Sequence, residues 1–328
     1  MNCVGVPIPE IPGLLVFLLK HSPVVSVYTG GGEMSSLGRT LLLGVLAVVG
    51  GSGVQPGLPS KTALGAAVGR AIGAKNPDPK FRNPDYLAIR FLGPRERSLL
   101  ADLPAGILDL DYDATIKQYP NPTFISAMLS RTRYFDERLD EALRGGARQI
   151  IILGAGLDSR GYRFKDLPRG VKFFEVDYGP TQEYKKQRVR EIFGRLPDRI
   201  RYVAMDFAKD DLLTELGKYG YSPSEKTLFI WEAVVFYLPE SAVKSTLHFV
   251  RDHSGPGSTI AFDYAFSRHP RMNNPNDPAA RAGEPWIFGF PETGAAEFVR
   301  QEGLQVVRDE LIPARDFGRC IGGVPERK

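Results

Sequence analysis

Glycines and acidic residues recur at the ends of apolar runs in the second half of this 328-residue chain. A turn with Gly154 and Gly156 follows the first of these runs, and Asp177, Asp206 and Glu232 follow later ones. Carboxylates accept hydrogen bonds from hydroxyl and amino groups, and glycines let a backbone pass close to a ligand because they carry no Cβ. The pattern therefore indicates a binding site for a small polar cofactor.

The elements that position these residues have the pattern of a parallel α/β sheet. Apolar segments bounded by turn residues alternate with amphipathic segments after Gly145, which is typical of strand-helix-strand units. We expect strands at Gln149–Leu153, Lys172–Val176, Arg201–Met205, Thr227–Trp231, Thr259–Asp263 and Gln305–Asp309. We expect helices at Pro180–Phe193, Asp210–Lys218, Glu240–His253 and Gly294–Glu302. A doubly wound, mostly parallel sheet of this kind binds ligands at the carboxyl ends of its strands.

The glycine turn and Asp177 together predict a nucleotide. Asp177 lies about twenty residues after the glycines, where a carboxylate accepts hydrogen bonds from both ribose hydroxyls. A dinucleotide fold calls for a third glycine at position 159, which here is Ser159, and Asp158 would repel a pyrophosphate. S-adenosylmethionine has an adenosine without phosphate and a sulfonium cation, so it suits the site better than NAD.

The later acids extend this interpretation. Asp206 is placed to accept from the adenine amino group, and Glu232 is placed near the sugar or the methionine end. A nicotinamide-dependent oxidoreductase, and a non-catalytic protein that only binds the nucleotide, are the alternatives.

Several segments resemble the leucine carboxyl methyltransferase family, whose members are S-adenosylmethionine-dependent O-methyltransferases with a Rossmann-like class I fold. The resemblance covers roughly residues 61–311, and polyketide carboxyl methyltransferases are among the members. It is carried by Ile151–Arg160, Phe173–Asp177, Trp231–Pro239 and the Arg-bearing segment Ser130–Asp136.

The resemblance implies a role for each matching position. Gly154, Ala155 and Gly156 would lie against the methionine part of the cofactor, Asp177 on its ribose, and Asp206 with Phe207 around its adenine. Glu232 would help to close the pocket. Either Arg131 or Arg133 would hold the cofactor carboxylate, because a guanidinium binds a carboxylate bidentately.

Methyl transfer from a sulfonium is an in-line displacement that needs positioning. A carboxylate acceptor, with a pKa near about 4, is already ionised at neutral pH and needs no general base, whereas a phenol near about 10 does. No Ser/His/Asp or Cys/His constellation is evident, which favours a carboxylate of a small molecule or chain end over a phenol. Arg160 and Arg163 either orient that carboxylate or pair with strand-end acids.

The chain divides into three expected parts. Residues 1–59 form a poorly ordered apolar leader, residues 60–147 a helical cap, and residues 148–328 the cofactor-binding domain, with a substrate-wall insertion near 265–292. Expected cap helices are Lys61–Ile72 behind a Ser60 N-cap, Pro84–Phe91, Arg95–Leu103 and Phe124–Leu143. The last strand of the domain, at Arg319–Val324, is either short or missing.

The composition of the chain limits which partners we expect, among nucleic acids, metal ions and membranes. The formal charge of +4 comes from 42 basic and 38 acidic residues with no basic block, so nucleic acid is not implied. Two cysteines at opposite ends and four histidines without metal-ligand spacing indicate no metal site. The apolar runs of the leader are too short to span a bilayer. We expect a cytoplasmic enzyme; membrane association or export through the leader is the alternative, because the segment read from Met34 loosely resembles a secretory signal.

Overall fold

A computed structural model of the chain describes residues 14–16, 24–28, 59–94, 103–292 and 294–310. Its central sheet has five parallel strands in the order β5-β4-β3-β6-β7. The strands are β3 (Gln149–Leu153), β4 (Lys172–Asp177), β5 (Ile200–Ala204), β6 (Thr227–Trp231) and β7 (Thr259–Asp263). This is the expected doubly wound sheet, and its strand order reverses between β3 and β6.

The strands form where the sequence has continuous apolar runs. Every residue of β3 and β6 is buried, as expected for parallel strands covered on both faces. Ile151 pairs with Phe174 of β4 and with Phe229 of β6. This register brings the carboxyl ends of the strands to one edge.

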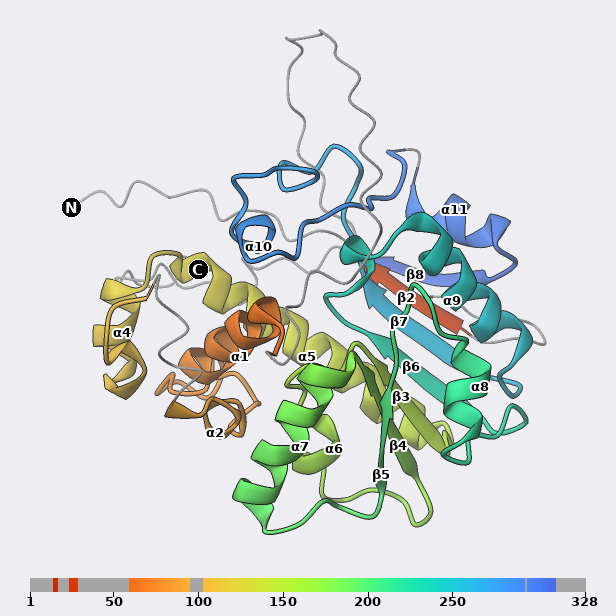
Figure 1. The fold of residues 1–328 in the computed structure, drawn as a ribbon, viewed down its shortest axis with the longest axis horizontal. Coiled ribbons are helices and arrows are strands. Elements are labelled where there is room, and N and C mark those ends of the chain that lie inside the picture. Colours follow the sequence, from red (N-terminus) through yellow and green to blue (C-terminus); the bar gives the residue numbers. More distant parts are fainter. Residues whose placement is uncertain (1–13, 17–23, 29–58, 95–102, 293, 311–328) are drawn as a thin grey trace, which may run out of the picture.

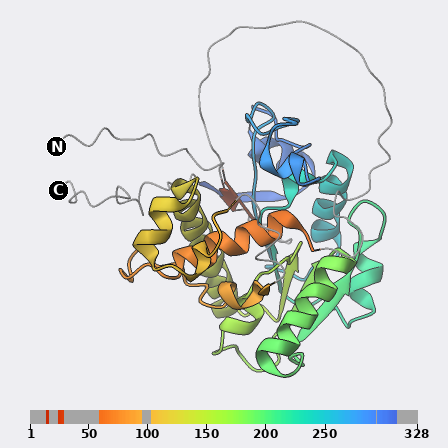
Figure 2. The ribbon, with the colours of Figure 1, turned by 60° about the vertical axis from the view of Figure 1, so that its left-hand side comes forward.

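Helices cover the sheet and form the cap. Figure 1 shows α1, α2 and α4 on one side of the molecule and α8, α9 and α11 on the other, and Figure 2 gives a second view. The cap helices are α1 (Lys61–Gly73), α2 (Ala88–Phe91), α4 (Tyr112–Gln118) and α5 (Pro122–Arg144), with the 3-10 turn η1 (Ile107–Asp109). The others are α6 (Arg160–Arg163), α7 (Gly179–Phe193), α8 (Leu212–Gly217), α9 (Glu240–Asp252), α10 (Pro278–Arg281) and α11 (Ala295–Gln301), with the 3-10 turn η2 (Val235–Tyr237).

The cap differs from expectation in detail. Ser60 is the predicted N-cap of α1 and its Oγ accepts from the Ala63 N–H at 3.1 Å. The helix predicted from Pro84 begins only at Ala88, because residues 83–86 form turns in which the Asn83 side chain accepts the Asp85 N–H. The expected helix Arg95–Leu103 falls, apart from Leu103, outside the described residues.

Two short strands of the predicted leader, residues 1–59, pair with the last described strand. Strands β1 (Leu14–Val16) and β2 (Val24–Tyr28) both pair with β8 (Gln305–Glu310), β1 antiparallel and β2 parallel to it. Figure 1 shows β2 between β8 and β7. The rest of residues 1–58 and the expected strand Arg319–Val324 lie outside the described residues.

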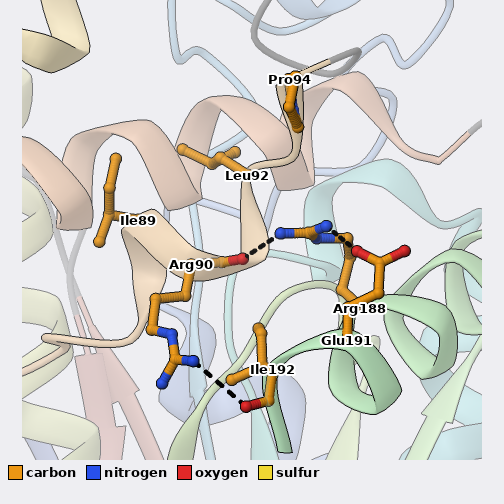
Figure 3. A pocket seen from close by; sticks show the side chains of 7 residues that line it. All are labelled: Ile89, Arg90, Leu92, Pro94, Arg188, Glu191 and Ile192. Atoms are coloured by element: carbon orange, nitrogen blue, oxygen red, sulfur yellow. Dashed lines mark hydrogen bonds and ion pairs between the residues drawn. The ribbon is translucent and has the colours of Figure 1, made fainter. Parts of the chain in front are cut away.

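A depression between α2 and α7 marks where the cap is joined to the sheet domain (Figure 3). Its two arginines cross between these helices: Arg188 donates to the Arg90 carbonyl at 2.7 Å, and Arg90 donates to the Ile192 carbonyl at 3.2 Å. The remaining lining is mainly apolar. These bonds fasten the two parts together, away from the strand ends.

Candidate active site

The glycine turn lies at the point where strand order reverses. Gly154 has φ of 68°, and a Cβ there would lie 2.3 Å from a methyl of Val234, which follows β6. Both Gly154 and Ala155 donate their N–H groups to the Val176 carbonyl, at 2.8 and 2.9 Å. The turn is therefore held to the end of β4, and only glycine fits at position 154.

Asp177 closes the other side of this turn. Its carboxylate accepts the N–H of Gly156 and, at 2.6 Å, the N–H of Tyr178. Burial raises the pKa of Asp177 to about 6, although these two N–H groups act to lower it. The predicted ribose ligand and the predicted glycine turn thus form one unit.

Asp206 and Phe207 lie beside this unit. The Met205 N–H donates to the Asp177 carbonyl at 2.9 Å, which places the start of the segment next to β4. Asp206 accepts the Ala208 N–H at 3.0 Å and pairs with Lys209 at 2.9 Å. Phe207 is half-buried against the core. The segment lies on the β5 side of the turn, and Glu232 lies on the β6 side.

The two candidate arginines on α5 are separated by the structure. The Arg131 guanidinium contacts Asp263 Oδ2 at 3.0 Å and approaches Glu232 Oε1 at 3.6 Å. The buried Nε of Arg131 has no hydrogen-bond partner among the described residues. Arg133 instead donates to the backbone carbonyls of residues 79 and 82, at 3.1 and 3.2 Å. Of these two arginines, Arg131 is the one seen to reach the acids at the strand ends.

Arg160 is the centre of a buried ion-pair network. It contacts Asp136 at 2.9 Å, Glu232 at 2.8 Å and Asp158. Burial acts to lower the pKa of Arg160, but the three carboxylates raise it well above its ordinary value. Arg160 was expected either to orient an acceptor carboxylate or to pair with strand-end acids. In the structure it is paired with acids.

Arg163 belongs to the same network. Its guanidinium pairs with Asp136 and donates to Ser159 Oγ at 2.9 Å. Ser159 in turn donates to Asp85 at 2.5 Å, and Asp85 pairs with Arg70 of α1 at 2.8 Å. The network therefore connects the start of α6 to two segments of the cap.

Asp158 occupies the start of α6. Its Oδ1 accepts the Arg160 N–H at 2.7 Å. Burial acts to raise the pKa of Asp158, but Arg160 and Lys185 outweigh this effect and the pKa is lowered. A carboxylate of the protein thus stands where a pyrophosphate would bind, which disfavours a dinucleotide.

Sequence reasoning missed Asp263 and Asp136 as site residues. Asp263 is the last residue of β7 and accepts the Ala233 N–H at 2.5 Å, where Ala233 has a positive φ of 59°. Burial raises the pKa of Asp263, although Arg131 acts to lower it. The strand-end rule that selected Asp177 and Glu232 would also have selected Asp263. Asp136 lies within the segment that carries Arg131 and Arg133.

A second buried pair supports the turn from the α7 side. Lys185 of α7 contacts Glu175 of β4 at 2.8 Å, and each side chain is only 1% exposed. Burial raises the pKa of Glu175 to about 7, although Lys185 acts to lower it. Lys185 also reaches the Ala155 carbonyl at 3.5 Å.

Two further findings concern the described residues. None of the helices in these ranges combines the length and apolar character needed to cross a membrane. Within the same ranges, no group of three or more His, Cys, Asp or Glu side chains is arranged to hold a metal ion.

The chain is similar in sequence to a known family of methyltransferases. The model of the leucine carboxyl methyltransferase family matches residues 63–251. A protein of Mycobacterium avium (strain 104) named "Putative S-adenosyl-L-methionine-dependent methyltransferase" is 33% identical over 228 residues, which are 66% of this chain and 67% of that protein. A similarly named protein of Mycolicibacterium smegmatis is 34% identical over 62% of this chain and 66% of its own length.

The matches thus span about two thirds of these relatives. Among solved structures, human N-acetylserotonin methyltransferase in complex with S-adenosylmethionine aligns with a TM-score of 0.35 and 14% identity, over 76% of this chain and 65% of that one. The family model covers more than half of the chain. The chain belongs to the leucine carboxyl methyltransferase family of S-adenosylmethionine-dependent methyltransferases.

Proposed function

We propose that this methyltransferase transfers the methyl group of S-adenosylmethionine to a carboxylate of a small molecule or chain end. When bound, the cofactor supplies an electrophilic methyl group on a sulfonium. The enzyme holds the acceptor oxygen in line with that methyl carbon and its sulfur, and it uses no general base.

This proposal rests on the acids at the strand ends, because donor groups of the protein already bind their oxygens. Glu232 is bound by Arg160, Asp263 by Arg131 and the Ala233 N–H, and Asp177 by two backbone N–H groups. Both oxygens of each of these carboxylates thus face a donor of the protein, the second Glu232 oxygen lying 3.6 Å from Arg131. Among the described residues, these three acids are engaged by the protein and not directed at an acceptor hydroxyl, whereas a carboxylate acceptor needs no deprotonation.

The charge of the site supports the cofactor. Six carboxylates lie in the site with four guanidiniums, those of Arg70, Arg131, Arg160 and Arg163. The carboxylates are Asp85, Asp136, Asp158, Asp177, Glu232 and Asp263. The excess of negative charge suits a cation such as a sulfonium. The buried Arg131 Nε lies 3.6 Å from Glu232 Oε1 and has no hydrogen-bond partner among the described residues, so it can still donate a hydrogen bond to the cofactor carboxylate.

Each residue then has a positioning role. Arg131 holds the cofactor carboxylate, and Gly154 to Gly156 lie along the methionine part. Asp177 accepts the ribose hydroxyls, Asp206 and Phe207 lie at the adenine, and Glu232, held by Arg160, helps to close the pocket. Arg160 and Arg163 are then positioning residues for these acids, and the acceptor carboxylate needs another partner.

The acceptor wall belongs to the cap and to the insertion near 265–292. In the insertion, Trp286 stacks on Phe236 of η2 with ring centroids 3.9 Å apart, and His269 lies 5.0 Å from Trp286. Trp286 and Phe236 are both buried in this stack, so the stack fixes the insertion against η2. An insertion held there by aromatic side chains suits an apolar organic acid as acceptor.

We also propose that the enzyme is cytoplasmic. Fractionation of cells that express the chain from Met1 and from Met34 tests this location.

The class of acceptor can be tested by the chemistry of the product. The enzyme is incubated with S-adenosylmethionine labelled in its methyl group and with a panel of small carboxylic acids, each matched to a phenol of similar shape. Alkali releases labelled methanol from a methyl ester but not from a phenyl methyl ether. We expect base-labile label on carboxylic acids; base-stable label found only on phenols would contradict the carboxylate assignment.

A further inference from the structure

The first turn of α1 lies directly over the glycine turn. The methyl group of Ala63 would be 3.2 Å from a Cβ built on Gly156. The Ser60 N–H also donates to Thr181 Oγ1 of α7 at 3.1 Å. Val234 packs on Gly154 in the same way, so the two together cover the glycine turn along which the proposed cofactor would lie.

A single carboxylate from the insertion holds this turn in place. Glu284 accepts the Lys61 N–H at 2.9 Å and the Ser60 hydroxyl at 2.8 Å, and it also accepts the Thr62 hydroxyl. Glu284 is 9% exposed. Hydrogen bonds to a buried carboxylate are stronger than those between neutral groups.

The two partners of this contact differ in how firmly they are anchored. The insertion is tied down beside Glu284, because the N–H groups of Ile287 and Phe288 both donate to the Phe236 carbonyl, at 2.8 and 3.2 Å. In α1, burial in the core begins at Leu64, which is 1% exposed, whereas Thr62 and Ala63 are only half-buried. Pro59, directly before the turn, is also buried, so we expect movement to be confined to residues 60–63.

Gly65 makes this movement easier. A Cβ at Gly65 would have no atom within 4 Å, so packing does not require glycine there. Gly69 in the same helix is different, because a Cβ there would lie 2.7 Å from Met128 and Phe124. A glycine in the second turn weakens the helix next to the segment that covers the crevice.

We propose that residues 60–63 are a lid over the cofactor crevice and that Glu284 is its latch. The closed turn excludes the cofactor, and fraying of the turn admits it. The apparent affinity then depends on the fraction of molecules with an open lid. This inference rests on the proposed function, because it takes the crevice beside Gly156 and Asp177 as the cofactor site.

The test uses S-adenosylhomocysteine, which lacks the sulfonium charge, at pH 8. Glu284 acts to raise the pKa of Asp177, which is about 6, so at pH 8 Asp177 is ionised with either residue at position 284. Glu284→Gln and Ser60→Ala weaken the latch, and Gly65→Ala strengthens the helix. We expect the first two to speed amide hydrogen exchange at residues 61–64 of the free protein. We also expect them to lower the calorimetric dissociation constant by about threefold to tenfold.

Gly65→Ala is expected to do the opposite. It should slow exchange at the same amides and raise the dissociation constant by about twofold to fivefold. The matched controls are Glu292→Gln, an exposed glutamate of the same insertion, and Gly217→Ala at the end of α8, where a Cβ also meets open space. Neither control should change exchange at residues 61–64.

The outcomes separate the two proposals. If the wild-type chain binds S-adenosylhomocysteine and the three variants leave its dissociation constant unchanged, the lid is contradicted and the cofactor site stands. If the wild-type chain does not bind it at all, the proposed function fails and the lid fails with it.

Discussion

The two walls of the proposed cofactor site are held by different kinds of contact. On the sheet side, the glycine turn is fixed by backbone hydrogen bonds to β4 and is supported by the buried pair of Glu175 and Lys185. On the cap side, the first turn of α1 is held mainly by the side chains of Glu284 and Thr181. A backbone frame is rigid, and side-chain contacts can open locally. We therefore expect a preformed sheet wall and propose a movable cap wall.

The largest effect is expected from breaking the pair beneath the rigid wall. Lys185→Met leaves the Glu175 carboxylate buried without its cation, which should lower the free energy of unfolding by about 3–5 kcal/mol. Denaturant unfolding at pH 7.5 measures the loss. The double variant with Glu175→Gln should recover most of it; a loss in the single variant below about 1 kcal/mol would contradict a structural role for the pair.

This loss should depend on pH in a defined direction. Burial raises the pKa of Glu175 above its ordinary value, and removal of Lys185 raises it further because Lys185 acts to lower it. A carboxyl group with a raised native pKa binds its proton more tightly in the folded state, so its cost to stability appears as pH rises through that range. The deficit of Lys185→Met should therefore be smaller at pH 5 than at pH 8. A deficit that grows as pH falls would contradict this assignment.

The next effect concerns the arginine that faces the acids. Arg131→Lys keeps the charge but loses the bidentate fork, so we expect the dissociation constant for S-adenosylhomocysteine to rise by about tenfold or more. Arg133→Lys, two residues away on the same helix, is the matched control and should change it little. A larger effect at Arg133 would contradict the placement of the carboxylate clamp on the inner side of α5.

Cofactor affinity should also depend on pH through Asp177, whose pKa is raised to about 6. Below that value the protonated carboxyl accepts weaker hydrogen bonds, so affinity should fall as pH decreases from 7.5 to 5, by up to about tenfold. Calorimetric titrations across this range measure the change. Asp177→Asn should flatten the profile, and an equally steep profile in that variant would assign the titration to another group.

The smallest effect lies in the movable wall. Gly65→Ala should raise the free energy of unfolding by about 0.4–1 kcal/mol, because alanine favours the helix and its Cβ meets open space. Gly69→Ala should instead destabilise the protein, because its Cβ would overlap Met128 and Phe124. Thermal unfolding compares the two variants. Equal effects would contradict the difference in packing along α1.

The sheet was predictable because its strands are buried on both faces and appear as continuous apolar runs. Three strands, such as Gln149–Leu153, were predicted with the same bounds as observed. The short helices at Arg160–Arg163 and Pro278–Arg281 have too few residues to show a helical period. The helix at Tyr112–Gln118 did have a signal, because Asp111 is a typical N-cap residue and accepts the Ala114 N–H.

The site was predictable only in part. Strand ends are visible in sequence, so Asp177 and Glu232 could be selected. Arg131 and Arg133 were left open, although positions 131 and 133 differ by about 200° around a helix and the apolar Met128 and Phe135 lie three and four residues from Arg131. This pattern would have favoured Arg131. The network of Arg160 joins residues 136, 158 and 232, which only tertiary structure brings together.

The central claim is that the crevice beside Gly156 and Asp177 binds the cofactor, and calorimetric titration of S-adenosylhomocysteine into wild type and Asp177→Ala at pH 8 tests it most directly. We predict one site per chain in the wild type and a loss of about 1.5–3 kcal/mol of binding free energy in the variant. Absence of binding to the wild type, or equal affinity in the two proteins, would contradict this placement of the cofactor.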